Sequence, residues 1–330
     1  MLLPDIYFEK DYAVLTSIIE GGEAQEYIYS DDNGTIRNVF IKRSIDLEIE
    51  GKKYYDIITP YGYGGPIILD CLGNKEELTK NYKENFREFC KSESIVSELI
   101  RFHPILNNAL DFKSSHNIEL VRKTVATRLE ENEDAFTKEF SKSTRKLIRR
   151  LLSDEKFTYK IYNNPANLEN FIKIYKDTMD RNQARDFCYF GKDYFDKLSE
   201  LFSEETYVID VFYDSECIAS GLYFIYGDFL HAHLSGTLNK YLDLSPAYYL
   251  KYLTLELGQA KGCKYIHYGG GTSNAEDDGL LAFKKKFTKT GIFDFYIAKE
   301  IHLEDIYKEL VEKSQKRDPG FFPEYRARTR

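Results

Sequence analysis

Three strand-like segments follow one another between residues 206 and 237, and a helix and another strand come directly after them. The segments "TYVIDVFYD", "CIASGLYFIYG" and "DFLHAHLSGT" are rich in β-branched and aromatic residues and are separated by turn-forming sequences. Ser245-Pro246 is typical of a helix start, and Gly262 is typical of a helix end. The segment "KYIHYGGG" is the next strand. This order predicts a mixed, mostly antiparallel sheet flanked by helices, an α/β (α+β) fold.

The first half of the chain shows a similar order of elements. The segments "AQEYIYS" and "NVFIKRSI" are strand-like and flank "DDNG", a strong turn signal. Residues 75–93 carry Leu78, Tyr82, Phe86 and Phe89 at helical spacing. The segments "SIVSELIRFHPILNN" and "IELVRKTVATRL" are further strand candidates. We therefore expect two related α/β domains with a cleft between them.

A chain of 330 residues is long enough for two domains. Residues 133–152 predict an amphipathic helix, in which Phe136, Phe140, Leu147 and Leu151 form one apolar stripe. We place the domain junction there. The expected boundaries are an N-terminal domain at 1–135, a linking helix at 136–152 and a C-terminal domain at 153–330.

The composition, with 42% hydrophobic and 30% charged residues, is that of a globular protein. No apolar run is long enough to span a bilayer, and the first residues do not have the pattern of a signal peptide, so we expect a cytoplasmic protein. The formal charge of −8 argues against a large nucleic-acid footprint. The five cysteines form no CxxC pair, so neither a disulfide framework nor a zinc site is indicated.

Five segments carry a resemblance to a known family. They are "FTKEFSKSTRKLIRRLLSDEKFTYKI", "FIKIYKDTMDRNQARDFCYF", "HAHLSGT", "YIHYGGG" and "GLLAFKKKF". Their order resembles that of the Fem-type aminoacyltransferases of peptidoglycan, and more closely that of the shorter FemAB-like, GNAT-fold acyltransferases of bacteria. The segment "TPYGYGGPI" also looks like the shorter group, and the resemblance spans about residues 55 to 300. It implies a tandem pair of GNAT folds, with a central strand splayed to admit an acyl donor.

The sequence departs from the family in two places. The long helical arm of tRNA-dependent Fem enzymes is missing, and "LNKYLDLS" stands where acetyl-CoA-dependent members carry a Gly-rich pyrophosphate loop. We therefore expect no bound cofactor, an acyl-CoA as donor co-substrate and an aminoacyl-tRNA as the alternative donor. The start of the helix at Ser245 remains available for an anion.

The glycines Gly269, Gly270 and Gly271 are expected to open a strand end and bring backbone close to a substrate. An ordinary loop after an edge strand is the alternative. Lys284, next to Phe283, lies where Fem-type enzymes carry a functional Phe-Lys pair, and a lysine can hold a phosphate or carbonyl oxygen. On spacing alone, a solvated lysine run is favoured; with the resemblance, Lys284 is the first catalytic candidate.

His231 and His233 alternate along one strand and are expected to face the same side, with His267 on the neighbouring strand. His233 is a candidate proton acceptor, and Ser235 in the same motif a candidate substrate contact. A plain structural histidine pair is the main alternative. An HxH pair also suits a metal, but the sequence shows no third ligand, so no metal site is predicted.

The remaining candidates are expected to line a substrate pocket. Tyrosines beside a glycine step suit stacking on a ring, although a decorated tight turn is equally consistent with them. The arginines suit a phosphate or carboxylate, against the alternatives of a structural pair and of a charge at a helix end. These residues are Tyr61, Tyr63, Gly64, Gly65, Arg101, His103, Arg181 and Tyr189.

The first functional hypothesis is an acyltransferase (EC 2.3) that moves an acyl or aminoacyl group to an amine by direct attack. By resemblance, the acceptor is a small-molecule, cell-envelope or sugar-nucleotide amine. The second is a catalytically inactive tandem-GNAT protein that binds a nucleotide-sugar or a peptide. A tRNA-dependent aminoacyltransferase is the third, and tRNA is the one nucleic-acid partner considered.

Overall fold

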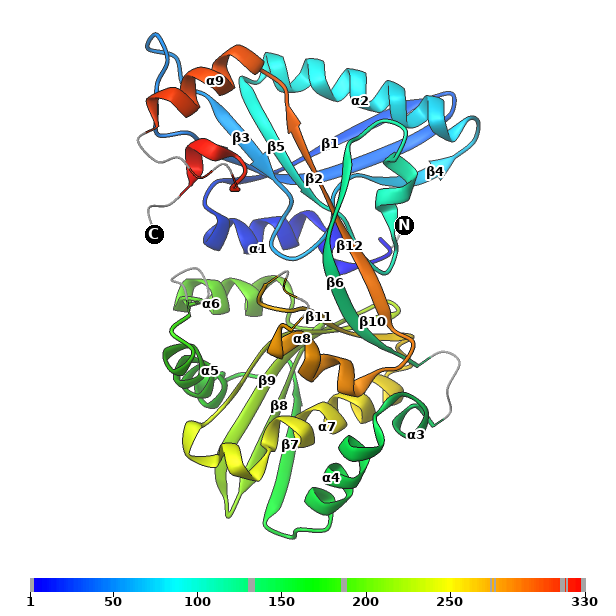
Figure 1. The fold of residues 1–330 in the computed structure, drawn as a ribbon, viewed down its shortest axis with the longest axis vertical. Helices are drawn as coiled ribbons and strands as arrows, with labels where there is room; N and C mark the ends of the chain where they lie inside the picture. Colours follow the sequence, from blue (N-terminus) through cyan, green and yellow to red (C-terminus); the bar gives the residue numbers. More distant parts are fainter. Residues whose placement is uncertain are drawn as a thin grey trace. The chain divides into compact units, whose positions relative to one another are not determined.

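The chain forms two compact units in the computed structural model, which describes residues 3–129, 134–184, 189–273, 275, 277–314, 318 and 320–327 (Figure 1). Unit 1 consists of Ile6–Arg122 and Asp294–Arg330, and unit 2 of Leu2–Asp5 and Lys123–Phe293. Each unit contains a mixed, mostly antiparallel sheet with helices on its faces. The predicted fold class is therefore confirmed.

The two units divide the chain differently from the expected boundaries at 1–135, 136–152 and 153–330. The last 37 residues, Asp294–Arg330, return to unit 1, because β12 (Ile292–Ile301) pairs with β5 (Ile95–Arg101). The segment expected to link two domains belongs to unit 2 and contributes Phe140, Ile148 and Leu151 to its core.

Unit 1 has a sheet in the order β1-β2-β3-β5-β12, and β4 pairs with β2. Its other elements are β1 (Glu23–Asp31), β2 (Gly34–Ser44), β3 (Tyr55–Ile58), β4 (Ile67–Cys71), α1 (Lys10–Glu20), α2 (Lys75–Ser92) and α9 (Glu304–Lys313). The pairing of β3 with β5 is parallel, because α2 lies between them in the chain and carries it back across the sheet.

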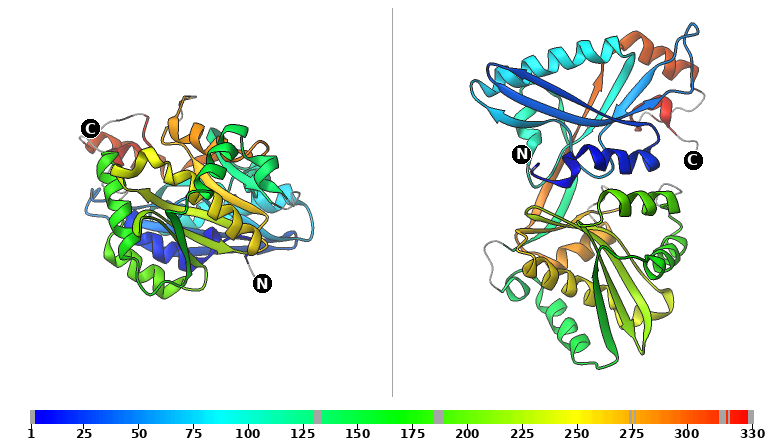
Figure 2. Two further views of the ribbon diagram at one scale, coloured as in Figure 1. Left: turned by 90° about the horizontal axis from the view of Figure 1, so that it is seen from below. Right: turned by 180° about the vertical axis from the view of Figure 1, so that it is seen from behind.

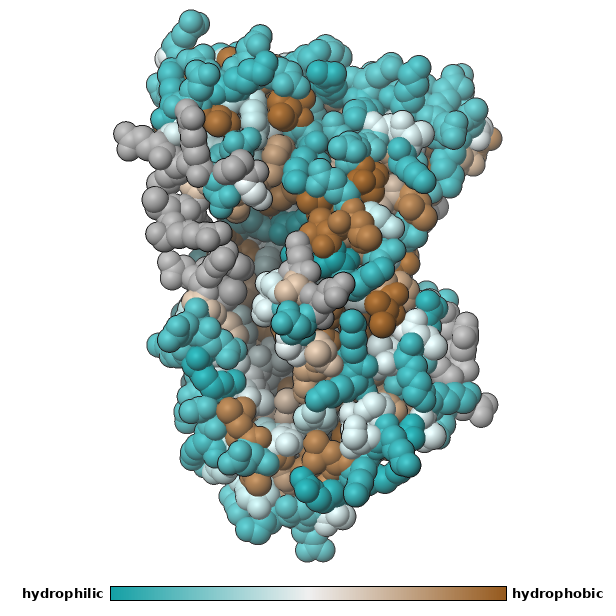
Figure 3. Space-filling view, viewed as in Figure 1, coloured by the Kyte–Doolittle hydropathy of each residue, from teal (hydrophilic) through white to brown (hydrophobic). Residues whose placement is uncertain are grey.

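Alternation along β2 explains why helices cover both faces of this sheet. Ile36 and Phe40 pack in the cluster that contains Tyr82 of α2, whereas Val39 and Ile41 pack with α1. Figures 1 and 2 show α2 and α1 on opposite sides of the strands. In Figure 3, mostly hydrophilic residues lie over the outer side of α2, as expected for an amphipathic helix.

Unit 2 has a sheet in the order β6-β11-β10-β9-β8-β7. Its elements are the second part of β6 (Ile118–Arg128), from Lys123 on, and α3 (Ala135–Glu139), α4 (Lys142–Leu152), β7 (Phe157–Asn163), α5 (Glu169–Arg181), α6 (Lys192–Leu201), β8 (Thr206–Tyr213), β9 (Glu216–Tyr226), β10 (Phe229–Thr237), α7 (Pro246–Ala260), β11 (Tyr265–Gly270) and α8 (Gly279–Lys284). The meander predicted over residues 206–237 is confirmed as β8, β9 and β10, which pair antiparallel.

The largest core cluster of unit 2 lies between the sheet and the helices α3, α4 and α7. It includes Ile209 and Val211 of β8, Leu253 of α7 and Ile266 of β11. The helix α5 packs on β9 and β10, where Phe171 and Ile174 are buried. As in unit 1, a strand, a helix and a parallel strand follow one another, here as β10, α7 and β11.

The helix predicted over residues 133–152 is interrupted. The backbone of Phe140 is extended, and Ser141 starts a second helix by accepting a hydrogen bond from the Thr144 N–H at 3.3 Å. The break lets Phe140 reach the core, where its ring meets Phe136 and Phe287. The cap at Ser141 and the burial of the Phe140 ring therefore favour two short helices over the one continuous helix that the apolar stripe predicts.

Within the described part of the chain, no helix combines the length and the apolar character needed to cross a membrane.

Candidate functional site

The parallel strands β10 and β11 separate after three residue pairs. They pair at Phe229–Tyr265, Leu230–Ile266 and His231–His267, and not beyond, although β10 continues to Thr237 and β11 to Gly270. Each strand has an irregular register at this point, between Ala232 and Leu234 on β10 and between His267 and Gly269 on β11. A bulge bends its strand, so the two irregularities direct the strand ends apart.

Lys284 lies at the open end of β11. Its ammonium donates a 2.6 Å hydrogen bond to the carbonyl oxygen of Gly270. Gly269 has a φ of +74°, a backbone conformation that other residues rarely adopt. The glycine step and the lysine therefore meet in the folded chain. Phe283 is half-buried and packs edge-on against Tyr248 of α7 and Phe287.

Asp278 fixes the loop between the glycines and α8. Its carboxylate accepts hydrogen bonds from the backbone and side chains of Thr272 and Ser273, at 2.6 to 3.0 Å, and caps α8 through the Leu281 N–H at 2.8 Å. These bonds, led by the Thr272 hydroxyl, hold the pKa of Asp278 well below its usual range. A Cβ on Gly271 would lie 2.3 Å from the carboxylate. Gly271 is thus required by packing.

Lys251 of α7 is a functional candidate that the sequence reasoning missed. Its side chain is buried, with 7% of the residue exposed, and its ammonium lies 4.5 Å from the ring centre of Tyr268 on β11. Burial, together with the charge of nearby Lys284, lowers the pKa of Lys251 from 10.5 to about 7. A signal was present in the sequence, because Lys251 stands at helical spacing from the buried Thr254 and Gly258.

His233 occupies the irregular position of β10 and is enclosed by aromatic rings. Its Nε2 shares a 2.7 Å hydrogen bond with the Tyr194 hydroxyl, and the Phe224 ring centre lies 4.8 Å away. Burial, with a smaller effect of His231, lowers the pKa of His233 to about 3. The imidazole is therefore neutral and a weak base near pH 7. That His233 accepts a proton stays a prediction, and this environment does not favour it.

His231 has a different environment from His233, because the irregularity at residue 233 interrupts the alternation expected along the strand. Its Nε2 lies 2.9 Å from both carboxylate oxygens of buried Asp5. Its ring lies 5.6 Å from that of His267, so the expected closeness of these two histidines is confirmed.

Arg181 lies at the end of α5 and donates a 2.8 Å hydrogen bond to the Thr237 carbonyl at the end of β10. It also lies 3.6 Å from Asp177, one turn earlier in the helix. Tyr189 donates to Asp180 at 3.0 Å, and Ser235 is exposed on β10. Arg181 is thus brought to the open end of β10, whereas Arg185 and Cys188 of the same segment lie outside the described residues.

In unit 1, the corresponding parallel strands are β3 and β5, and the chain segments that follow them remain hydrogen-bonded to each other. The Thr59 N–H donates to the Leu99 carbonyl at 3.1 Å, and Gly64 forms a parallel bridge with Phe102. Arg101 donates to the Thr59 carbonyl and pairs with Glu20 at 2.6 Å. The guanidinium is thereby engaged within unit 1, which matches the structural alternative for Arg101.

The tyrosine and glycine segment of unit 1 is packed rather than open. The Tyr63 ring meets Tyr7, His103 and Phe295 at 5.2 to 6.1 Å, and the Tyr61 carbonyl accepts from the Tyr12 hydroxyl at 2.9 Å. The amide of buried Asn108 donates to the carbonyls of Gly64 and Pro66, both at 2.9 Å. Gly65 has a φ of +75°, which the tight turn needs. The expected neighbourhood of Tyr63 and His103 is confirmed; a substrate-binding role for Tyr61, Tyr63, Gly64, Gly65 and His103 stays a prediction.

The start of α7 offers few backbone donors for an anion. A 3₁₀ helix, Asn239–Leu244, precedes it, and Ser245 has a left-handed backbone and no side-chain cap bond. Pro246 has no N–H, and the Tyr248 N–H donates to the Ser245 carbonyl at 3.1 Å. An anion bound near β10 and β11 would thus depend on side-chain cations.

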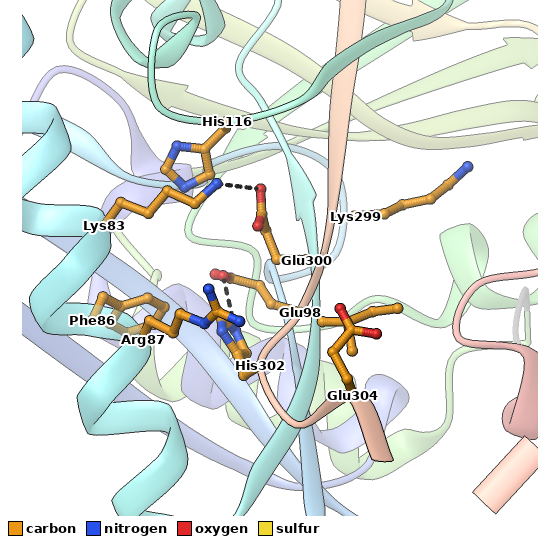
Figure 4. A pocket seen from close by; sticks show the side chains of 10 residues that line it. Lys83, Phe86, Arg87, Glu98, His116, Lys299, Glu300, His302 and Glu304 are labelled. Atoms are coloured by element: carbon orange, nitrogen blue, oxygen red, sulfur yellow. Dashed lines mark hydrogen bonds and ion pairs between the residues drawn. The ribbon is translucent and has the colours of Figure 1, made fainter. Parts of the chain in front are cut away.

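A polar cavity of about 310 Å³ lies in unit 1, and its lining contains none of the predicted candidates (Figure 4). Buried Glu98 accepts from Asn38 at 3.1 Å and lies 3.7 Å from His302, and Lys83 pairs with Glu300 at 3.1 Å. Burial lowers the pKa of nearby His116 to about 3. These residues are far apart in the sequence, so no local motif points to the cavity.

The family comparison agrees with this geometry. Residues 138–285 match the acetyltransferase (GNAT) domain family. That range contains α4, the meander, the separating strands and Lys284. No curated protein sequence matches the chain.

Solved structures share the architecture over nearly the whole chain. FemX is similar with a TM-score of 0.67 and 15% identity, covering 92% of this chain and 94% of FemX. L-PGS from Bacillus licheniformis is similar with a TM-score of 0.54 and 12% identity, covering 89% of this chain and 93% of L-PGS. The C-terminal domain of a putative lysylphosphatidylglycerol synthetase from Agrobacterium fabrum has a TM-score of 0.53 and 12% identity, covering 87% of this chain and 91% of that domain.

The chain therefore has a GNAT fold in an architecture like that of FemX, and residues 138–285 are similar to the acetyltransferase (GNAT) domain family. The resemblance to FemAB-like and Fem-type proteins is confirmed at the level of fold.

Proposed function

We propose that the protein is an N-acyltransferase that binds its acyl donor in unit 2, where β10 and β11 separate. The observation that carries this proposal is the loss of pairing after His231 and His267, with Lys284 held on the Gly270 carbonyl at the open end. A gap between two parallel strands exposes backbone N–H and C=O groups to a ligand. The donor's extended chain would complete that hydrogen bonding.

The reaction proposed is direct attack. The nitrogen of the acceptor amine forms a bond to the acyl carbon, the bond from that carbon to the donor's sulfur or oxygen breaks, and the amine proton passes to the leaving group or to water. Lys284 would stabilise the negative charge that develops on the carbonyl oxygen. Arg181 at the end of β10, Ser235 of β10 and Tyr189, which bonds Asp180 of α5, would contact the acceptor.

Acyl-CoA is the donor class we propose, with aminoacyl-tRNA as the alternative. The acceptor class is a cell-envelope or sugar-nucleotide amine, supported by the fold shared with FemX and with L-PGS. Both acyl-CoA and aminoacyl-tRNA carry phosphate groups. The start of α7 supplies few backbone N–H groups to bind a phosphate, so a side-chain cation of the site would have to bind it.

The test is a thermal-shift series on the wild type, Lys284→Ala and the control Lys285→Ala, an exposed lysine of the same run. Its ligands are acetyl-CoA, longer acyl-CoAs, UDP-sugars and deacylated tRNA. A ligand at about 100 times its Kd stabilises by about 2.7 kcal/mol. We expect a donor to stabilise the wild type and the control but not Lys284→Ala. Equal shifts in all three proteins would contradict the proposed site.

A catalytically inactive binding protein is the second candidate. It is favoured by the weak basicity of His233, the candidate acceptor of the amine proton. In that case UDP-sugars shift the melting temperature, whereas acyl-CoA and tRNA do not.

A further inference from the structure

We propose that Lys251, beside Lys284, forms an anion site that binds a phosphate group of the acyl donor. This inference deepens the proposed function and rests on it for the identity of the donor. The two lysines come from different helices, α7 and α8, and approach the same short segment of β11, Tyr268 to Gly270.

The first argument is the burial of an ammonium without a counter-charge. Within the described residues, Lys251 makes no hydrogen bond or ion pair, and its one close polar contact is with the face of the Tyr268 ring. Buried charges in proteins are usually paired or bound to a ligand, because desolvation is costly. A bound anion would supply the missing partner.

The second argument is the position of Lys251. Tyr268 is the first residue of β11 after the last pair with β10, so Lys251 lies at the base of the separation, whereas Lys284 lies at the Gly270 end. A ligand that enters between the strands from their open ends would meet both ammonium groups. Because the first turn of α7 has few free N–H donors, the Lys251 ammonium would replace the usual backbone contacts to phosphate.

The charged and titratable groups around Lys251 come from several elements. Lys284 of α8 repels it, Tyr268 of β11 faces it, and Tyr223 of β9 bonds Thr254 of α7 at 3.0 Å. Besides burial, the charge of Glu139 on α3 helps to raise the pKa of Tyr268. The Glu139 carboxylate already accepts hydrogen bonds from Thr288, Lys289 and Thr290. The remaining neighbours, α4, β8 and β10, contribute apolar side chains such as Ile148, Ile209 and Leu230 to the core beside α7.

This arrangement predicts that anion binding takes up a proton. A lysine with a pKa of about 7 is roughly nine-tenths protonated at pH 6 and one-tenth at pH 8, whereas the bound anion needs the ammonium. The affinity that depends on Lys251 therefore falls about tenfold between pH 6 and pH 8.

The experiment is calorimetric titration with pyrophosphate, CoA and the trinucleotide CCA at pH 6, 7 and 8. It compares the wild type with Lys251→Met, which keeps an unbranched stem, and with Lys285→Met as a control for the loss of one exposed charge. The phosphate's own titration is common to all three proteins. We expect the wild type and Lys285→Met to lose about ten times more affinity over this range than Lys251→Met does. CoA as the best ligand indicates a CoA donor, and CCA a tRNA donor.

The same pH dependence in Lys251→Met and the wild type would overturn the proposal, as would the absence of binding of all three probes at millimolar concentration. The proposed function fails separately. Phosphate binding that depends on Lys251, with no acyl transfer, would support the anion site and contradict the proposed acyltransferase activity. Acyl transfer with unchanged kinetics in Lys251→Met would support the activity and contradict the anion site.

Discussion

The ammonium of Lys284 donates a 2.6 Å hydrogen bond to the carbonyl oxygen of Gly270, so the end of α8 is joined to the end of β11. The bond places a positive charge where the neighbouring strand β10 has already separated. Asp278 holds the intervening loop by bonding Thr272 and Ser273. A fixed charge beside a gap between strands can stabilise an oxyanion without reorganising first.

Replacing Lys284 by alanine is expected to lower the rate of acyl transfer by about 10²- to 10³-fold, the usual effect of losing one oxyanion-stabilising donor. The melting temperature should change little, because the lysine is half-buried and lies near the end of a short helix. Initial rates with an identified acceptor measure the effect. Wild-type activity in Lys284→Ala, or an equal loss in Lys285→Ala, would rule out the assigned role.

Lys251→Met is expected to stabilise unit 2. The unfolded chain keeps the lysine protonated up to about pH 10.5, whereas the folded protein loses that proton near pH 7. The charged lysine thus penalises folding most at pH 7 and below, and the wild type gains stability as the pH rises from 7 towards 10. We expect the variant to raise the free energy of unfolding by about 3 kcal/mol at pH 7, with a smaller gain at pH 9. Urea unfolding at both values tests this; a less stable variant would show that the folded protein pairs this charge.

Gly271→Ala is expected to cost about 1 to 3 kcal/mol of stability. The new Cβ would lie 2.3 Å from the Asp278 carboxylate and displace the group that holds Thr272 and Ser273. Gly279→Ala is the matched control, because a Cβ there meets nothing within 4 Å at the start of α8. Thermal unfolding should show a lower midpoint for the first variant only. Equal midpoints would mean that the loop adjusts freely.

His233→Gln is expected to flatten the acid limb of the stability profile. The folded pKa of about 3 lies below the unfolded value of 6.5, so the unfolded chain binds the extra proton between these values. The stability that the neutral imidazole contributes is complete above pH 6.5 and is lost as the pH falls, by at most about 1.4 kcal/mol per pH unit. Urea unfolding at pH 7, 6, 5 and 4 measures the slope. Parallel profiles for the variant and the wild type would place the imidazole in contact with water.

The sequence predicted the elements well, because strands and helices follow from local periodicity. The meander at residues 206–237 was anticipated. The unit boundaries were not, since the pairing of β12 with β5 joins residues about 200 positions apart, and no local signal marks it. Arg101 shows the same limit: its partners Glu20 and Thr59 are fixed by the fold alone.

Lys251, in contrast, carried a local signal in the sequence. Its spacing from Thr254 and Gly258 indicated a buried position, yet a lysine on an apolar helix face is easily assigned to the surface. Its burial, the ring of Tyr268 and the charge of Lys284 come together only in the folded unit.

The most direct test of the donor site is hydrogen exchange of the wild type with and without acetyl-CoA, palmitoyl-CoA or deacylated tRNA. We predict that the ligand that binds slows exchange in residues 232–237 of β10 and 268–272 at the end of β11, where the strands have no partner in each other. Protection confined to the cavity lined by Lys83, Glu98 and His302, or absent from both strand ends, would contradict the account.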